Sequence, residues 1–150
     1  MGEDKFRRAI PVSVFIRAPL RWWVEADTYK VGTVKQSSSL MHRLARVGPF
    51  EPYEFSADTD PRSIEIVNEH WRAWIDAGAR RNSTCEHWRK MQDAIPRGFD
   101  YEAQLHLSYA VLATMHAQRR NHRQGEWRTF CAWTETLPHA WLITGANDDH

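Results

Sequence analysis

Two polar segments of this 150-residue chain carry side chains that could bind an anion. The more basic of them, residues 119–128, reads RRNHRQGEWR and holds four arginines within ten residues. A guanidinium donates two parallel hydrogen bonds, which suits a carboxylate or a phosphate. The alternative is a charged solvent face, in which Glu–Arg pairs at helical spacing contribute only about 0.2–0.5 kcal/mol each. The residue pattern alone leaves both interpretations open.

The other polar segment lies within residues 29–43 and has no clear helical or strand period. It combines lysines, a glutamine, a threonine and three serines: Lys30, Lys35, Gln36, Thr33 and residues 37–39. Such side chains could bind a nucleotide monophosphate, and the alternative is a solvated surface loop. A Walker-type phosphate loop is excluded, because that motif needs two glycines followed directly by Lys and Ser or Thr. Here Gly32 stands alone, and the lysine comes three residues later.

Other catalytic and metal-binding motifs are not recognisable. Cys85 and His87 are two residues apart, and His116 and His122 are six apart, so neither pair has the spacing of a common zinc motif. The chain has no GxSxG sequence and no Cys–His pair at a familiar spacing. We therefore predict no metal ion and no protein nucleophile.

The overall charge and composition restrict the class of partner. Lys and Arg number 20 against 19 Asp and Glu, a formal net charge of +1, so the chain has no general basic field for a nucleic-acid polymer. No apolar run approaches the roughly 20 residues of a membrane span. The two cysteines, without a recognisable signal peptide, are typical of a reducing cytoplasm. These features favour a cytoplasmic protein with a small anionic ligand, without a membrane or nucleic-acid partner.

The apolar spacing predicts the elements that must position these segments. Alternation predicts a strand at 10–17, Pro19 can open a short helix, and 46–62 reads as an extended connection. Helices are expected at 63–78, after Ser83 or Thr84 up to Pro96, at 101–119, and from about Gly125 to Pro138. This order predicts one α+β domain over residues 1–150, with a small sheet covered by helices and with flexible ends at 1–9 and 145–150.

Eight tryptophans are many for a chain of this length. Most fall at core positions of the expected helices, namely Trp71, Trp74, Trp88, Trp127 and Trp133. We expect these to pack in the core or at an interface. Trp22 and Trp23 come just before the segment at 29–43, so one of this pair is the tryptophan expected to contact a ligand.

The two polar segments, in this order, resemble the flavin-dependent thymidylate synthases, the ThyX family. The family motif RHRxxSxNExSxR lies without a gap over residues 28–40, where Ser38 matches outright and Lys30 and Thr33 are close substitutes. Residues 119–128 are similar to the family's LRxxxHAQxEIR, with His122, Gln124, Glu126 and Arg128 in register. Ile95 and Pro96, followed by Phe99 and Tyr101, look like the family's LPxxxYT.

Several positions depart from the family motif. Thr28 and Leu40 replace arginines that serve the flavin and dUMP in the family, and Lys35 and Gln36 replace Asn and Glu. The last two changes make the segment more positive, which suits an anionic ligand that differs from dUMP or binds without flavin. The resemblance therefore predicts a diverged member.

The resemblance implies a ThyX-like fold and reductive methylation of dUMP to dTMP, with FAD as cofactor and NADPH and methylenetetrahydrofolate as co-substrates. It also implies a homotetramer with sites between subunits. The nucleotide-binding residues would be Lys30, Thr33, Lys35, Gln36, Ser38 and Arg128. The cofactor-binding residues would be Arg119, His122 and Gln124.

Two other functions stay open at this stage. One is a catalytically inactive module of the ThyX fold that acts by nucleotide binding or assembly, because two motif arginines are lost. The other is an unrelated α+β interaction domain whose tryptophan-bearing helices bind a protein partner.

Overall fold

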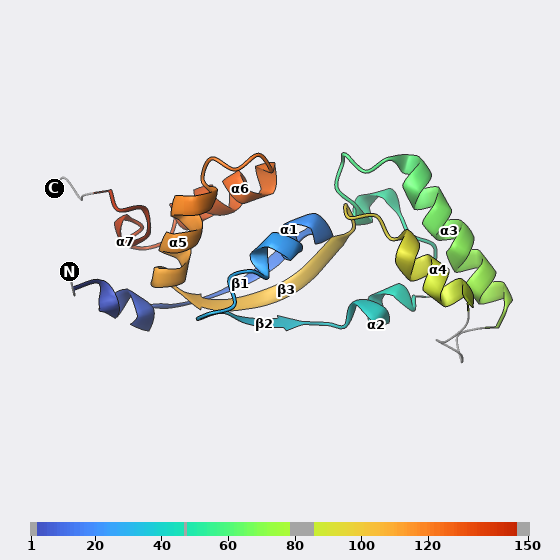
Figure 1. The fold of residues 1–150 in the computed structure, drawn as a ribbon, viewed down its shortest axis with the longest axis horizontal. Coiled ribbons are helices and arrows are strands. Elements are labelled where there is room, and N and C mark those ends of the chain that lie inside the picture. The colour runs from blue at the N-terminus through green and yellow to red at the C-terminus, as the bar shows by residue number, and fades with distance from the viewer. Residues whose placement is uncertain (1–2, 47, 79–85, 147–150) are drawn as a thin grey trace. The chain divides into compact units, whose positions relative to one another are not determined.

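The computed structural model describes residues 3–46, 48–78 and 86–146, which form two compact units (Figure 1). The sheet unit is built from Met1–Ile16, Trp22–Ser37 and Ala103–His150, and the helical unit from Arg17–Arg21 and Ser38–Glu102. In the described residues the strands are β1 Pro11–Pro19, β2 Val34–Ser37 and β3 Asp100–Ser108. The α-helices are α1 Leu20–Ala26, α2 Leu40–Leu44, α3 Pro61–Asp76, α4 Glu86–Ala94, α5 Tyr109–Arg119, α6 Gly125–Thr134 and α7 Trp141–Thr144, and the 3-10 helices are η1 Glu3–Ala9 and η2 Pro52–Glu54.

The strands form one sheet in the order β1-β3-β2, so β3 is the central strand. β2 is antiparallel to β3, with Val34 opposite His106 and Gln36 opposite Gln104. Side chains are buried at every second residue of β3, which gives the sheet one packed face and one open face. Within the sheet unit, α1, α5 and α6 lie on the packed side (Figure 1).

The prediction of one helix over residues 101–119 was wrong in its first half. Residues Asp100–Ser108 form strand β3, and the helix begins at Tyr109, whose amide donates to the carbonyl of Ile10 at 3.1 Å. Leu105 fits both a helical and an alternating pattern, whereas the burial of Ala103 and Leu107 fits only the strand. β2 was also missed, because all four of its residues are exposed and show no apolar alternation.

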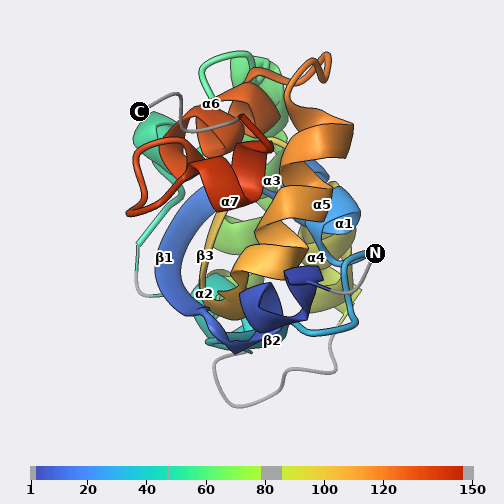
Figure 2. The ribbon, with the colours of Figure 1, turned by 90° about the vertical axis from the view of Figure 1, so that its left-hand side faces the viewer.

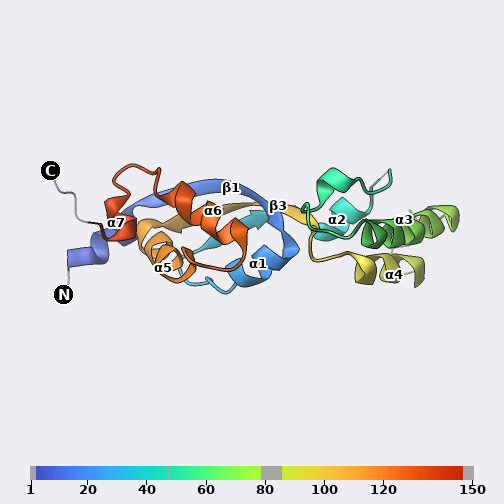
Figure 3. The same ribbon diagram turned by 90° about the horizontal axis from the view of Figure 1, so that it is seen from above.

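Aromatic side chains fill the space between the sheet and its helices. Trp22 and Trp127 are almost fully buried, and their ring centroids are 4.8 Å apart. Trp23 packs edge-on against Trp22 at 4.9 Å and is 3% exposed. Core packing is thus confirmed for Trp127, and Trp22 has the same role. At the end of the unit, η1 and α7 both contact α5 (Figures 2 and 3).

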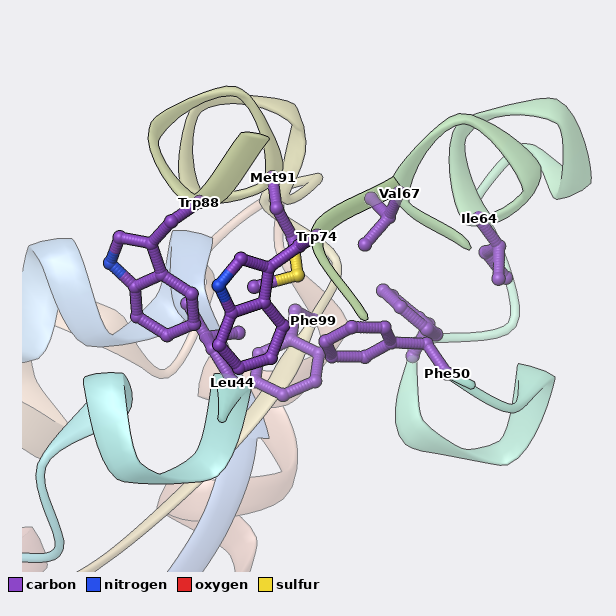
Figure 4. Close-up of a cluster of buried hydrophobic side chains, with 9 residues drawn as sticks. Leu44, Phe50, Ile64, Val67, Trp74, Trp88, Met91 and Phe99 are labelled. Atoms are coloured by element: carbon purple, nitrogen blue, oxygen red, sulfur yellow. The ribbon is translucent and has the colours of Figure 1, made fainter. Parts of the chain in front are cut away.

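The helical unit has a core of its own, built around α3 and α4. Asp60 caps α3 by accepting a hydrogen bond from the amide of Arg62, and Pro61 occupies the first turn. Trp74 and Trp88 meet with ring centroids 4.9 Å apart, surrounded by aliphatic and phenylalanine side chains (Figure 4). The helix predicted at 63–78 is confirmed, and the predicted caps Ser83 and Thr84 lie outside the described residues.

The predicted fold class is confirmed, since a small sheet is covered by several helices and the C-terminal region is helical. The turn near Gly125 is a new start, because α5 ends at Arg119 and α6 begins at Gly125. The single-domain prediction and the flexible ends stay predictions.

Candidate functional site

A hollow of about 810 Å³ lies in the sheet unit where the segment 28–32, the end of β3 and the start of α5 meet. We call it the basic hollow. Its lining comprises Arg8, Pro11, residues 28–32, His106, Leu107, Ser108, Ala110, Val111 and Thr114. Ligand pockets generally measure about 300–1,000 Å³, so a nucleotide-sized molecule fits this volume. Five of its lining residues come from the segment in which the sequence placed a phosphate site.

The ionisable groups that line the basic hollow are Arg8, Tyr29, Lys30 and His106, and no described carboxylate lines it. Within the part of the chain that the structure describes, neither Arg8 nor Lys30 makes an ion pair. The first turn of α5 adds the positive end of a helix dipole. In a chain whose charges almost cancel, this concentration of positive charge favours an anion.

Gly32 brings the segment 28–32 close to α5. Its φ of +77° lies in the left-handed region, where side chains other than hydrogen are strained. A Cβ atom at this position would lie 3.1 Å from Cγ2 of Val111, tighter than an ordinary contact. The glycine therefore allows both the turn before β2 and the close approach that shapes this wall of the hollow.

A second, smaller hollow of about 130 Å³ is lined by the same segment and its neighbours, among them Lys30, Thr33 and Lys35. Lys35 is held there, because its Nζ lies 2.6 Å from Oδ1 of Asp27 and 5.2 Å from the ring centroid of Trp23. The hydroxyl of Thr33 is buried without a hydrogen-bond partner in the structure. Three of the predicted nucleotide-binding residues therefore lie together, and Lys30 lines both hollows.

The other predicted nucleotide-binding residues lie elsewhere. Gln36 is on the open face of the sheet, with Oε1 at 3.4 Å from Nε2 of His106. Ser38 belongs to the helical unit, where its carbonyl accepts a 2.6 Å hydrogen bond from the hydroxyl of Tyr101. Arg128 donates from Nη1 to two carbonyls of the turn before α6, those of His122 at 2.5 Å and Arg123 at 2.9 Å.

The predicted cofactor-binding residues converge on one carboxylate, that of Glu25. Nη1 of Arg119 and Nε1 of Trp127 donate to Glu25 Oε2 at 2.7 and 2.9 Å, and the amide of Gln124 donates to Oε1 at 3.1 Å. Nε2 of His122 lies 3.3 Å from Oε2. We call these five residues the Glu25 cluster. It ties α1 to the turn between α5 and α6.

The Glu25 cluster also holds Tyr29 and so reaches the basic hollow. Nε of Arg119 donates to the hydroxyl of Tyr29 at 3.0 Å, and that hydroxyl donates to Oε1 of Gln118 at 2.7 Å. The guanidinium also lies over the rings of Tyr29 and Trp127, at 5.7 and 4.9 Å from their centroids. Arg119 and Gln118 thus hold Tyr29, the residue next to Lys30, in place.

Sequence reasoning missed Arg8, His106 and Glu25. His106 was missed because β3 was read as helix, and the alternation of buried residues along 101–107 would have placed it on the outer face. Glu25 lies about a hundred residues from its partners, so no local spacing indicates the pairing. Nothing in the sequence pairs Arg8 in η1 with the start of α5.

Other kinds of site are not found in the described residues. No group of three or more His, Cys, Asp or Glu side chains gathers there as a metal site. Burial raises the pKa of the Cys131 thiol to about 11, which keeps the thiol protonated at neutral pH. None of the described helices combines the length and apolar character needed to cross a bilayer.

No family model matches the sequence, and a search of the curated proteins finds no match. Solved structures do match the fold. Two are of ThyX from Helicobacter pylori in complex with FAD and dUMP, with TM-scores of 0.67 and 0.66, both at 13% identity over 90% of this chain and 72% of that chain. Another is the UMP/dUMP methylase PolB from Streptomyces cacaoi bound with 5-Br UMP, with a TM-score of 0.57 at 16% identity over 90% of this chain and 73% of that chain. This chain thus has the fold of the flavin-dependent thymidylate synthases, as its resemblance to them predicted.

Proposed function

We propose that this protein is a diverged ThyX-like methyltransferase that binds a pyrimidine deoxynucleotide and FAD and transfers a one-carbon unit to the base. The observation that carries the proposal is the position of the segment 28–32. The first five residues of the stretch that resembles the family motif, Lys30 among them, line a nucleotide-sized hollow with positive charge and no described carboxylate. The fold neighbours are complexes with FAD and dUMP and a UMP/dUMP methylase, which supports the same ligand class.

The residues of the basic hollow fit the phosphate groups of a nucleotide or a dinucleotide. Arg8 of η1 and Lys30 of the segment 28–32 both line the hollow. Ala110 and Val111, in the first turn of α5, also line it, and their backbone N–H groups have no partner within the helix. In the smaller hollow, the partnerless buried hydroxyl of Thr33 is a polar group that a ligand or a water can satisfy. FAD, when bound, supplies the hydride chemistry of the reaction.

Each group of protein side chains has a separate task in this proposal. Lys30 and Arg8 neutralise the charge of the phosphate. Lys35 and Gln36 bind the nucleotide. Arg119, His122 and Gln124 act on the cofactor side through Glu25 and Tyr29, which they hold in place. NADPH and methylenetetrahydrofolate are the proposed co-substrates, and a homotetramer in the cytoplasm is the proposed assembly.

A second function is favoured by the Glu25 cluster. Three residues that the resemblance assigns to the cofactor already hydrogen-bond or pair with an internal carboxylate. A protein that kept the fold but lost flavin chemistry would bind a nucleotide without turning it over. Reductant-dependent methylation of dUMP, assayed by mass spectrometry of the nucleotide, distinguishes the two, because only the enzyme converts the base.

The proposal is tested first by the visible spectrum of protein purified without added cofactor and by calorimetric titration with FAD and with dUMP. We expect bound oxidised flavin or micromolar binding of FAD. In Lys30→Ala we expect affinity to fall about tenfold, because one charge-assisted phosphate contact contributes on the order of 1–2 kcal/mol. The matched control is Lys90→Ala on α4, where Lys90 pairs with Glu86 at 2.6 Å. A colourless protein that binds neither FAD nor dUMP would falsify the proposal.

A further inference from the structure

The carboxylate of Glu25 receives hydrogen bonds on both of its oxygens, as the carboxylate of a bound ligand does. Nη1 of Arg119 and Nε1 of Trp127 donate to Oε2 at 2.7 and 2.9 Å, and Nε2 of Gln124 donates to Oε1 at 3.1 Å. Nε2 of His122 lies 3.3 Å from Oε2. Side chains from the end of α5, the turn after it and the start of α6 thus converge on one carboxylate of α1.

Two of these donors are held in place by contacts that do not involve Glu25. The indole of Trp127 is fully buried, with its ring centroid 4.8 Å from that of Trp22. The guanidinium of Arg119 lies 4.9 Å from the ring centroid of Trp127, and its Nε donates to the hydroxyl of Tyr29 at 3.0 Å. Donors that are already oriented lose little freedom when an anion binds to them. We therefore expect the arrangement of donors to persist when the carboxylate of Glu25 is removed.

The carboxylate of Glu25 can be removed without loss of the helix that carries it. Trp22, Trp23 and Ala26 are buried and fix α1 in the sheet unit. The side chains of Glu25 and Arg119 are 29% and 20% exposed, so solvent reaches this ion pair. A small anion in solution can therefore reach the donors once the carboxylate is absent.

We propose that the donors of the Glu25 cluster form a carboxylate-binding site, and that Glu25 is an internal occupant that excludes external carboxylates from it. The expected external ligand is a carboxylate, because both oxygens of such a group find a donor there. The inference goes beyond the proposed function, since it requires neither nucleotide nor flavin binding. It gives Arg119, His122 and Gln124 an anion-binding capacity that the folded chain masks.

The test is thermal denaturation of Glu25→Ala at about pH 7, in sodium acetate and in sodium chloride of equal ionic strength. When acetate is in tenfold excess over its dissociation constant, binding to the folded state alone raises the melting temperature by about 3–6 °C. We expect this rise in Glu25→Ala, measured relative to the unaltered protein. The unaltered protein should show only the general effect of the salt, because its own carboxylate fills the site.

Two further variants and one spectroscopic measurement locate the effect. The matched control is Asp27→Ala, which removes a nearby carboxylate of the same unit, paired with Nζ of Lys35 at 2.6 Å. Acetate should raise the melting temperature of this variant no more than that of the unaltered protein. Arg119→Ala, added to Glu25→Ala, should abolish the rise. In Glu25→Ala, acetate should also shift the nuclear magnetic resonance signal of the Trp127 indole N–H.

The results either support the proposal or overturn it. A rise confined to Glu25→Ala, together with the shift of the Trp127 signal, supports the proposal. A rise that Asp27→Ala shares, or one that survives the loss of Arg119, overturns it, as does the absence of any rise. If Glu25→Ala is unfolded in chloride, acetate must restore its circular dichroism signal, and failure to do so overturns the proposal too. None of these outcomes bears on nucleotide or flavin binding by the unaltered protein.

Discussion

The Glu25 cluster and the basic hollow both contain cationic or hydrogen-bond-donating side chains, but only those of the cluster have an anionic partner within the described residues. In the cluster, Arg119 and its neighbours converge on a carboxylate that is itself only 29% exposed. In the hollow, Arg8 and Lys30 make no ion pair in the described part of the chain. The arginine-rich segment therefore makes contacts within the fold, whereas the segment with fewer arginines contributes a lysine that has no ion-pair partner in the described residues.

This difference shows that the function of a cluster of basic residues depends on whether their hydrogen bonds are already satisfied within the fold. A guanidinium whose donors are satisfied inside the fold holds elements together, and a ligand must break those bonds to use it. A cation without a partner beside a hollow has no such competitor. The comparison makes opposite predictions for the two regions: substitutions in the Glu25 cluster should mainly change stability, and substitutions in the hollow should mainly change ligand affinity.

The largest effect is expected from Glu25→Ala. The substitution leaves the donors of Arg119, Gln124 and the fully buried Trp127 without their acceptor, so we expect the free energy of unfolding to fall by about 2–3 kcal/mol. Urea unfolding followed by tryptophan fluorescence measures the change. The matched substitution in the hollow, Lys30→Ala, should cost less than about 0.5 kcal/mol, as for other surface positions. Equal costs for the two variants would remove the distinction.

Gly32→Ala is expected to have the next largest effect, and it tests the wall of the hollow. The alanine must adopt a positive φ and must move Val111, so we expect a loss of about 1–2 kcal/mol in unfolding free energy. Gly78→Ala provides the control, because its φ is also positive, at +67°, but a Cβ there meets nothing within 4 Å. Thermal denaturation of both variants separates the cost of the contact from that of the backbone conformation. Identical melting temperatures would mean that the contact with α5 has no energetic consequence.

Arg128→Ala addresses a residue that the sequence assigned to the nucleotide. Its hydrogen bonds to two carbonyls before α6 predict a loss of about 1 kcal/mol in stability. The resemblance predicts a loss of nucleotide affinity with little loss of stability. Chemical denaturation and dUMP titration of the same variant decide between the two roles.

How much the sequence could predict varied with the range of the interactions involved. The helix at 63–78 and the strand at 10–17 follow from apolar periodicity, which is a local signal. β3 was misread because Leu105 and Tyr109 satisfy both a helical and an alternating pattern, and strand pairing decides between them. The grouping of Lys30 with Thr33 and Lys35 was predicted because all three belong to one segment. The positions of Glu25 and Arg8 were not predicted, because the partners of Glu25 and the other residues around Arg8 in the hollow come from distant parts of the chain.

The smallest effect concerns chemical reactivity, and it reports on the packing of α6 beside the Glu25 cluster. Burial and the nearby Glu135 raise the pKa of the Cys131 thiol to about 11, above that of an unfolded cysteine. The stability due to the protonated thiol is complete below the unfolded pKa and is lost as the pH rises through about 11. We expect the peptide that contains Cys131 to be alkylated far more slowly at about pH 8.5 than in the denatured chain, as measured by mass spectrometry. Glu25→Ala should speed this labelling by loosening α6, whereas Lys30→Ala should leave it unchanged. Acceleration by both variants would mean that the two regions are coupled in stability and that their roles are not separate.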